Sequence, residues 1–164
     1  MRVAGVDPGL GGALALLDNA RLVEVHDMPV LLLRKGKTDK RDIDGYALLE
    51  LVKSLRADVV YIERVGGIPG CSTANAFSFG YAAAAPRFLF QASGVRVAEL
   101  VPPQNWQRAL GLVKAGKDGS RSAAMRLWPE QAKCFSRVKD DGRAEAALIA
   151  EFGRRQEINR GFFS

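Results

Sequence analysis

The first 26 residues alternate between short apolar runs and turn residues, a pattern typical of antiparallel strands. Arg2–Val6 is a short apolar run, and Gly11–Leu17 is a second one that is rich in small residues. Asp18-Asn19 is a tight-turn signal, and Leu22–His26 alternates apolar and polar positions as in a third strand. The amino-terminal pattern therefore predicts a β-meander.

Apolar runs of helical and of strand length alternate over residues 42–101. Apolar residues at helical intervals predict a first helix that ends at about Arg56 and has Asp42 or Asp44 as its N-cap. Pro86 is expected to kink or split the second helix. The later elements predicted here are a strand over Asp58–Glu63, a helix from Thr73 to about Gln91 and a strand over Val95–Val101.

The other segments are more polar. Arg34–Arg41 predicts an exposed, flexible loop. Asp140 and Asp141 are both candidates for the N-cap of the last helix. The elements predicted after residue 101 are a short helix over Trp106–Leu112, a basic loop over Lys114–Ser120, a helix from Ser120 or Ser122 to about Leu127, and a last helix over about 142–155.

A meander followed by strands that alternate with helices predicts an α/β fold. We expect a mixed five-stranded sheet, antiparallel in its first part and parallel afterwards, with helices on both faces. The chain has 164 residues, the size of one ordinary domain, and contains neither repeats nor a domain linker. Residues 1–164 are therefore expected to form a single domain, with a basic C-terminal tail from about residue 156.

Composition narrows the class of protein. Hydrophobic residues make up 48% of the chain and charged residues 26%, as in ordinary globular domains. No apolar stretch approaches the roughly 18 residues of a membrane helix, and Asp7 interrupts any secretory signal. His26 is the only histidine, and Cys71 and Cys134 stand alone, which excludes a structural zinc site. We therefore expect a cytoplasmic protein with free thiols and no membrane partner.

The formal net charge is +6, and it is unevenly distributed. Residues 1–100 carry 12 basic and 11 acidic side chains, whereas residues 101–164 carry 12 basic and 7 acidic side chains. A basic C-terminal part indicates a polyanionic partner such as nucleic acid. The alternative is a charge that serves solubility alone.

Carboxylates stand where two strands end and where the last helix begins. Asp7 follows the first strand, and Glu63 closes the apolar strand in the middle of the chain. Asp141 and Glu145 lie four residues apart, on one face of a helix. A carboxylate at a buried strand end is costly unless it is paired or binds a metal. Oxygen donors without His or Cys suit Mg²⁺ or Mn²⁺, and two such ions clamp the oxygens of a phosphodiester displacement.

Each carboxylate also has an ordinary structural explanation. Asp7 is compatible with a simple turn, and Glu63 with an exposed strand end. Asp141 is compatible with an N-cap, for which Asp140 competes, and Glu145 with a solvated helix position. The case for a metal site depends on the residues occurring together.

The segment Gly111–Asp118 matches the GxxxxGK pattern of a phosphate-binding loop. Its last residue is Asp, whereas the magnesium-binding position requires Ser or Thr. The residues before it are expected to be helical, whereas such a loop follows a strand. No nucleotide cofactor is therefore expected.

Four segments of the chain together resemble the motifs of one known family. They are Asp7–Ala15 at the first strand and turn, Tyr61–Glu63 at an acidic strand end, Val101–Trp106, and Asp141–Ala150 at the start of the last helix. The family is that of the RuvC-type Holliday junction resolvases, and Val101–Trp106 is similar to its phage and prophage members. The resemblance covers about residues 1–155. It implies an RNase H-like fold, a homodimer and Mg²⁺-dependent paired nicking of four-way DNA junctions that leaves 5′-phosphate ends.

The resemblance also implies a role for each acidic residue. Asp7, Glu63 and Glu145 match the acidic positions of the family, and Asp141 is the fourth. Asp7 would bridge two Mg²⁺ ions, for which Mn²⁺ would substitute, and the other carboxylates would complete the metal shells. Glu145 stands where the bacterial members usually have aspartate, and its separation of four from Asp141 replaces their usual three. This spacing leaves the choice between Asp140 and Asp141 open.

The same resemblance implies contacts to branched DNA. Lys117 is the candidate for stabilising transition-state charge. Ile68, in the loop after Glu63, occupies the region where the bacterial members carry an aromatic residue that probes the junction centre. The alternatives are a less selective nuclease of the same fold that acts on branched DNA or RNA–DNA hybrids, and a non-catalytic junction-binding protein. The candidate basic contacts are Arg108, Lys114, Lys117 and Arg121.

Overall fold

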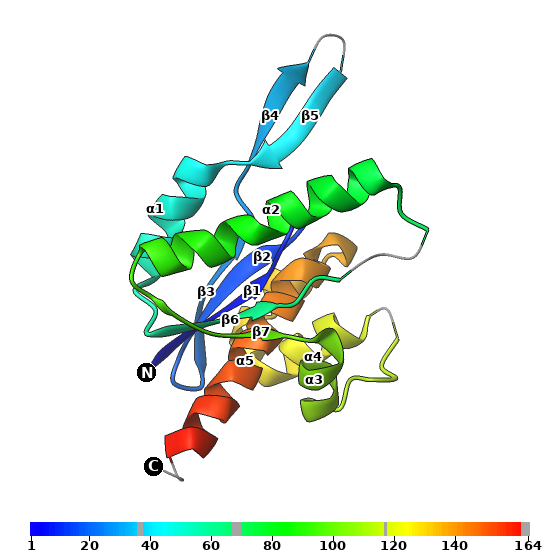
Figure 1. Cartoon of the computed structure of the whole chain (residues 1–164). Coiled ribbons are helices and arrows are strands. Elements are labelled where there is room, and N and C mark those ends of the chain that lie inside the picture. Colours follow the sequence, from blue (N-terminus) through cyan, green and yellow to red (C-terminus); the bar gives the residue numbers. More distant parts are fainter. Residues whose placement is uncertain (36–37, 67–69, 117, 162–164) are drawn as a thin grey trace.

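The computed structural model describes residues 1–35, 38–66, 70–116 and 118–161 (Figure 1). Its strands are β1 (Arg2–Asp7), β2 (Ala13–Asp18), β3 (Arg21–Asp27), β4 (Val30–Lys35), β5 (Thr38–Ile43), β6 (Val59–Glu63) and β7 (Arg96–Val101). Its helices are α1 (Gly45–Leu55), α2 (Thr73–Ala92), α3 (Pro103–Ala109), α4 (Gly119–Leu127) and α5 (Asp141–Gly161), with short 3-10 helices η1 (Pro129–Phe135) and η2 (Val138–Asp140). In this described part of the chain, no helix has the length and apolarity needed to cross a membrane.

The predicted mixed sheet is confirmed. Within the described residues it has five strands in the order β3-β2-β1-β6-β7. β1, β2 and β3 pair antiparallel, whereas β1, β6 and β7 pair parallel. Val6 of β1 lies opposite Ile62 of β6, so both strands end at the same edge of the sheet.

Side chains that alternate along the strands build a hydrophobic core on each face of the sheet. On one face Val3 and Tyr61 pack with residues of α4 and α5. On the other face Val6 and Ile62 pack with residues of α1 and α2. Figure 1 shows α5 crossing the sheet on the side away from α1 and α2, so the predicted cover of both faces is confirmed.

Helix α5 lies very close to the central strand because glycines line the contact. A Cβ atom at Gly5 of β1 would collide with the backbone of Ala146 and Ala150 in α5. Gly153 of the helix leaves similar room for the ring of Tyr61. The backbone of α5 therefore rests directly on β1, with no side chain between them.

Polar contacts fix α5 near both of its ends. Near its start, Arg143 donates to Asp27 of β3 with an Nη2–Oδ2 distance of 2.6 Å. Near its end, Glu157 accepts a hydrogen bond from the Tyr61 hydroxyl at 2.7 Å and pairs with Arg96 at 2.6 Å. Burial and the hydrogen bond to Glu157 raise the pKa of the Tyr61 hydroxyl, so Tyr61 stays a donor.

The prediction of a flexible loop over Arg34–Arg41 is wrong. β4 and β5 form an antiparallel hairpin in which Leu33 lies opposite Lys40. At its root, the Asp44 N–H donates to the Pro29 carbonyl oxygen at 3.0 Å. A hairpin with solvent on both faces does not need the apolar alternation by which a strand is recognised, so the polar sequence concealed it.

Helices differ from the prediction at three places. The short helix predicted over Trp106–Leu112 is α3, and it lies earlier in the chain, at Pro103–Ala109. Pro86 does not split α2, because its buried ring packs in the sheet-facing side of the helix, and burial offsets the lost hydrogen bond. α5 continues to Gly161, so the residues predicted as a tail from about 156 are helical to that point. Of the two N-cap candidates for α1, Asp44 is the one used, and its Oδ1 accepts from the Ala47 N–H at 2.9 Å.

Gly5→Ala is expected to destabilise the protein by about 1–3 kcal/mol, because the added methyl group overpacks the contact between β1 and α5. Gly80→Ala is the matched control, since a Cβ at this exposed position in α2 meets nothing within 4 Å. The control is expected to stabilise the protein by up to about 1 kcal/mol. Urea unfolding measures both, and a wild-type midpoint for Gly5→Ala would contradict the close packing.

Candidate active site

The shared edge of β1 and β6 brings two acidic side chains together. Asp7 is the last residue of β1, and Glu63 is the last residue of β6. The two strands are parallel neighbours in the centre of the sheet. Both carboxylates therefore lie at one edge, where the sequence predicted them.

The first turns of α5 supply a third carboxylate. Gly142 lies so close to β1 that a Cβ atom there would stand 2.9 Å from Asp7 Oδ2. Glu145 follows within one helical turn, and its negative charge acts on Asp7. We call Asp7, Glu63 and Glu145 the acidic cluster.

Like charges in a poorly solvated place dominate the electrostatics of the acidic cluster. Burial, and then the charges of Glu145 and Glu63, raise the pKa of Asp7 to about 8. Burial, and then the charge of Glu63, raise the pKa of Glu145 to about 7. Burial also raises the pKa of Glu63. Without a cation, the acidic cluster therefore retains protons near neutral pH.

Two neighbouring donors hold the cluster's glutamates. Trp106 Nε1 donates to Glu63 Oε1 at 2.9 Å, and the Ser120 hydroxyl donates to Glu145 Oε1 at 3.4 Å. Each hydrogen bond lowers the pKa of its carboxyl, against the larger effect of burial. Neither donor is predicted as a site residue from the sequence. The only available signal was the position of Trp106 just after the strand that pairs with β6.

The structure separates Asp140 from Asp141. Asp140 is 1% exposed, and its carboxylate accepts from the Arg137 backbone N–H at 2.8 Å and from Arg137 Nη2 at 2.7 Å. Asp141 is exposed and pairs with the buried Arg121, with an Nε–Oδ1 distance of 2.9 Å. The charge of Asp141 also contributes to the raised pKa of Glu145. Asp141 therefore lies beside the acidic cluster, and Asp140 anchors the chain before α5.

The predicted DNA contacts have different surroundings. Arg108 and Lys114 are exposed. Arg121 is buried and held between two carboxylates, so it is placed to orient acidic side chains more than to reach a surface phosphate. Lys117 and Ile68 lie outside the described residues.

The chemistry of the acidic cluster fits a hard divalent cation. Its donors are carboxylate oxygens, and a cation would relieve the repulsion that raises their pKa values. In the part of the chain that the structure describes, no group of three or more His, Cys, Asp or Glu side chains is already arranged to hold a metal ion. The donors Trp106, Ser120 and Arg121 hold the carboxylates in their present positions. Side-chain rotation would therefore have to complete the site.

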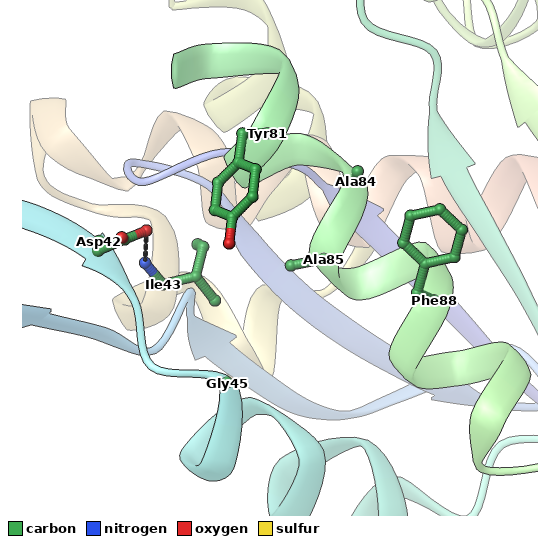
Figure 2. Close-up of a pocket in the computed structure, with 7 residues that line it drawn as sticks. All are labelled: Asp42, Ile43, Gly45, Tyr81, Ala84, Ala85 and Phe88. Carbon is green, nitrogen blue, oxygen red and sulfur yellow. Dashed lines mark hydrogen bonds between the residues drawn. The ribbon is translucent and has the colours of Figure 1, made fainter. Parts of the chain in front are cut away.

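Open space adjoins the acidic cluster. A hollow of about 480 Å³ is bordered by Asp7, the turn after β1 and the first half of α2. Figure 2 shows a second hollow, of about 310 Å³, between the β5–α1 junction and α2. Tyr81, Phe88 and Asp42 line this second hollow. The Asp42 carboxylate accepts a hydrogen bond from the Ile43 N–H at 2.8 Å. Of these two hollows, the first is the one beside the candidate catalytic residues.

Solved structures with this fold include two of RuvC. The structure of T. thermophilus RuvC in complex with a Holliday junction substrate has a TM-score of 0.61 and 20% identity, with 96% of each chain covered. A Thermus thermophilus RuvC structure has a TM-score of 0.59 and 21% identity, with 96% of this chain and 97% of that chain covered. No protein-family model and no curated protein matches the chain. The likeness confirms the RNase H-like fold that the resemblance to RuvC-type resolvases implied.

Asp7→Asn is expected to stabilise the cation-free protein at pH 8 and to leave its stability at pH 4 nearly unchanged. The pKa of Asp7 rises on folding from 3.8 to about 8, so between these values the folded state binds more protons than the unfolded state. Stability therefore falls as the pH rises through this window, and the substitution removes that loss. We expect a gain of at least about 1.4 kcal/mol at pH 8, the equivalent of one pKa unit.

Urea unfolding in a chelator at pH 4 and pH 8 provides the measurement. Asp18→Asn is the control, because Asp18 lies at the opposite end of the sheet from the acidic cluster. An equal gain at both pH values would show that charge at Asp7 is not the cause.

Proposed function

We propose that this chain is a RuvC-type endonuclease that resolves four-way DNA junctions by paired, symmetric nicks. The acidic cluster carries the proposal, because it gathers carboxylates from β1, β6 and α5 at one edge of an RNase H-like sheet. The RuvC structure that shares this fold is in complex with a Holliday junction substrate. The shared fold supports the same class of substrate for this chain.

The acidic cluster and Asp141 would together hold two divalent cations, Mg²⁺ or Mn²⁺. When bound, such ions supply an activated water and stabilise charge on the phosphate. Asp7 would bind both ions, and Glu63 and Glu145 would each complete the shell of one. Arg121 would orient Asp141 through their ion pair.

Basic side chains would bind the DNA backbone around this site. Arg108 and Lys114 are exposed and suited to phosphate contacts. Lys117 would stabilise the charge that develops on the phosphate as the P–O3′ bond breaks, leaving a 5′-phosphate and a 3′-hydroxyl. Ile68 would lie at the junction centre. We place this activity in the cytoplasm of a bacterium or a phage-infected host.

A non-catalytic junction-binding protein is the less favoured alternative. Structural carboxylates are normally paired with cationic side chains, as Asp140 is with Arg137. Among the described residues, no ion pair neutralises Asp7, Glu63 or Glu145. Half-buried carboxylates that lack a cationic partner support a role in binding metal. A less selective nuclease of the same fold would share this site and differ in its choice of substrate.

The exposed face of α2 supports the proposal of a homodimer. Phe77, Tyr81 and Phe88 are 74%, 68% and 60% exposed, and we call them the apolar stripe of α2. Their spacing of four and seven residues places them on one side of the helix. Tyr81 and Phe88 also line the hollow of Figure 2. A two-fold contact between two such stripes would match the symmetry of two opposed nicks.

Wild-type protein is expected to cut an end-labelled four-way junction in Mg²⁺ at symmetric positions and to leave a linear duplex of the same sequence intact. Asp7→Asn is expected to reduce cleavage at least about 100-fold while binding is kept or tightened, because a negative charge near phosphate is removed. Asp18→Asn is the control and should cut normally. Cleavage that survives Asp7→Asn would refute the metal site, and cutting of both substrates would move the function to a less selective nuclease.

Tyr81→Ser/Phe88→Ser is expected to weaken dimerisation at least about tenfold, which corresponds to about 1.4 kcal/mol. Val113→Ser removes another exposed apolar side chain, distant in sequence from α2, and serves as the control. Sedimentation equilibrium of the three proteins provides the measurement. A double variant that dimerises like the wild type would exclude the apolar stripe as the subunit contact.

A further inference from the structure

The β4–β5 hairpin leaves the body of the protein beside the acidic cluster. Figure 1 shows it extending outward beyond α2. At its root, Arg41 Nη2 donates to the Leu10 carbonyl oxygen at 2.6 Å, in the turn that follows Asp7. A hollow of about 270 Å³ is lined by Leu10, Lys40 and Arg41, and Leu10 also lines the hollow that reaches Asp7. Open surface therefore runs from the acidic cluster to the hairpin.

Basic side chains lie on both faces of the hairpin. Arg41 is opposite Leu32, and Lys40 is opposite Leu33. Opposed residues share a face, and successive residues alternate between faces. Arg34 and Arg41 therefore belong to one face and Lys40 to the other.

Both faces of the hairpin are also open to solvent. Leu32 is 68% exposed on the face of Arg34, and Leu33 is 46% exposed on the face of Lys40. Arg34 and Lys40 are themselves exposed. Because the protein body covers neither face at the outer part of the hairpin, two surfaces of another molecule have access to it at the same time.

Arg34 and Lys40 of the hairpin take part in no ion pair among the described residues. Asp39 lies opposite Arg34 on the same face, and Lys40 is opposite Leu33. The C-terminal part, which the sequence marked as the basic region, has most of its arginines in internal ion pairs. These are Arg121, Arg137, Arg143, Arg154, Arg155 and Arg160. The hairpin therefore offers basic side chains to a polyanion, as the exposed Arg108 and Lys114 do elsewhere on the surface.

We propose that the β4–β5 hairpin is a wedge that lies between two duplex arms of branched DNA, with Arg34 and Lys40 on phosphates of different arms. This inference rests on the proposed function and assigns recognition of branched DNA to the β4–β5 hairpin. Exposed basic side chains on opposite faces suit two polyanionic surfaces, whereas a linear duplex presents one. DNA on both sides would also support a free two-stranded hairpin, which has little stability of its own.

The test compares binding to a four-way junction and to a linear duplex in a chelator over a series of salt concentrations. For Arg34→Gln/Lys40→Gln, junction affinity is expected to fall roughly tenfold and the salt slope by about 2, since each phosphate contact contributes about 1. Duplex affinity is expected to fall less than about threefold, because one face at most contacts a single duplex.

Arg21→Gln/Arg56→Gln is the control with the same change in net charge. Arg21 lies opposite Asp18, and Asp58, two residues after Arg56, donates its N–H to the Arg2 carbonyl oxygen at 2.9 Å. Both arginines are thus at the end of the sheet away from Asp7. The control is expected to keep the preference of the wild type for junctions.

Three results would overturn the wedge. The first is an equal loss of junction and duplex affinity in the hairpin variant, and the second is the same loss of preference in the control. The third is wild-type junction binding by the hairpin variant, in which case dissociation of the dimer by Leu32→Ser would identify a subunit contact. Binding is measured without cleavage, so a protein that senses junctions through the hairpin but does not cut them would refute only the nuclease.

Discussion

The direct contact between α5 and β1 is the constraint on which the rest of the structure depends. The sheet edge by itself provides only Asp7 and Glu63. The third carboxylate comes from a helix, and a helix normally stands off a sheet by the length of its side chains. Gly5 and Gly142 remove that separation, one beneath the body of α5 and the other beside the Asp7 carboxylate. These two glycines therefore determine how close Glu145 lies to the sheet edge.

The acidic cluster opposes the stability of the fold that holds it. Burial and mutual repulsion raise the pKa values of Asp7 and Glu145, so ionisation near neutral pH strains the folded state. The two hydrophobic cores on the faces of the sheet provide the compensating stability. Local destabilisation at one edge of an otherwise well-packed domain is typical of sites that bind a charged ligand.

Local patterns were enough to predict the parts of the fold whose signals are local. The meander, the buried strand that ends at Glu63 and the acidic start of the last helix all follow from spacing and burial preferences. Strand ends also predicted that Asp7 and Glu63 would meet. The hairpin was missed because the outer part of neither face is buried against the body, so its sequence does not alternate between apolar and polar residues.

Other features depend on contacts that a sequence does not contain. Asp140 and Asp141 are adjacent and chemically identical, and only their contacts in the fold distinguish them, with Arg137 for Asp140 and with Arg121 for Asp141. The bond from Trp106 to Glu63 joins residues 43 positions apart. Net charge also does not show which side chains are available, because Arg137 and Arg154 of the C-terminal part are paired in the fold.

The contacts that hold α5 near both of its ends would limit how the proposed metal site responds to a cation. Arg143 ties the first turns to β3, and Glu157 ties the last turns to Tyr61 and Arg96. With backbone against backbone between these points, sliding of the helix along the sheet would break both sets of contacts at once. The helix is therefore held in one position, and adjustment to the proposed ion would be left to rotation about the side-chain bonds of the carboxylates. Selection among cations of different radius would then be a property of rotamers, decided within a few ångströms of the ion.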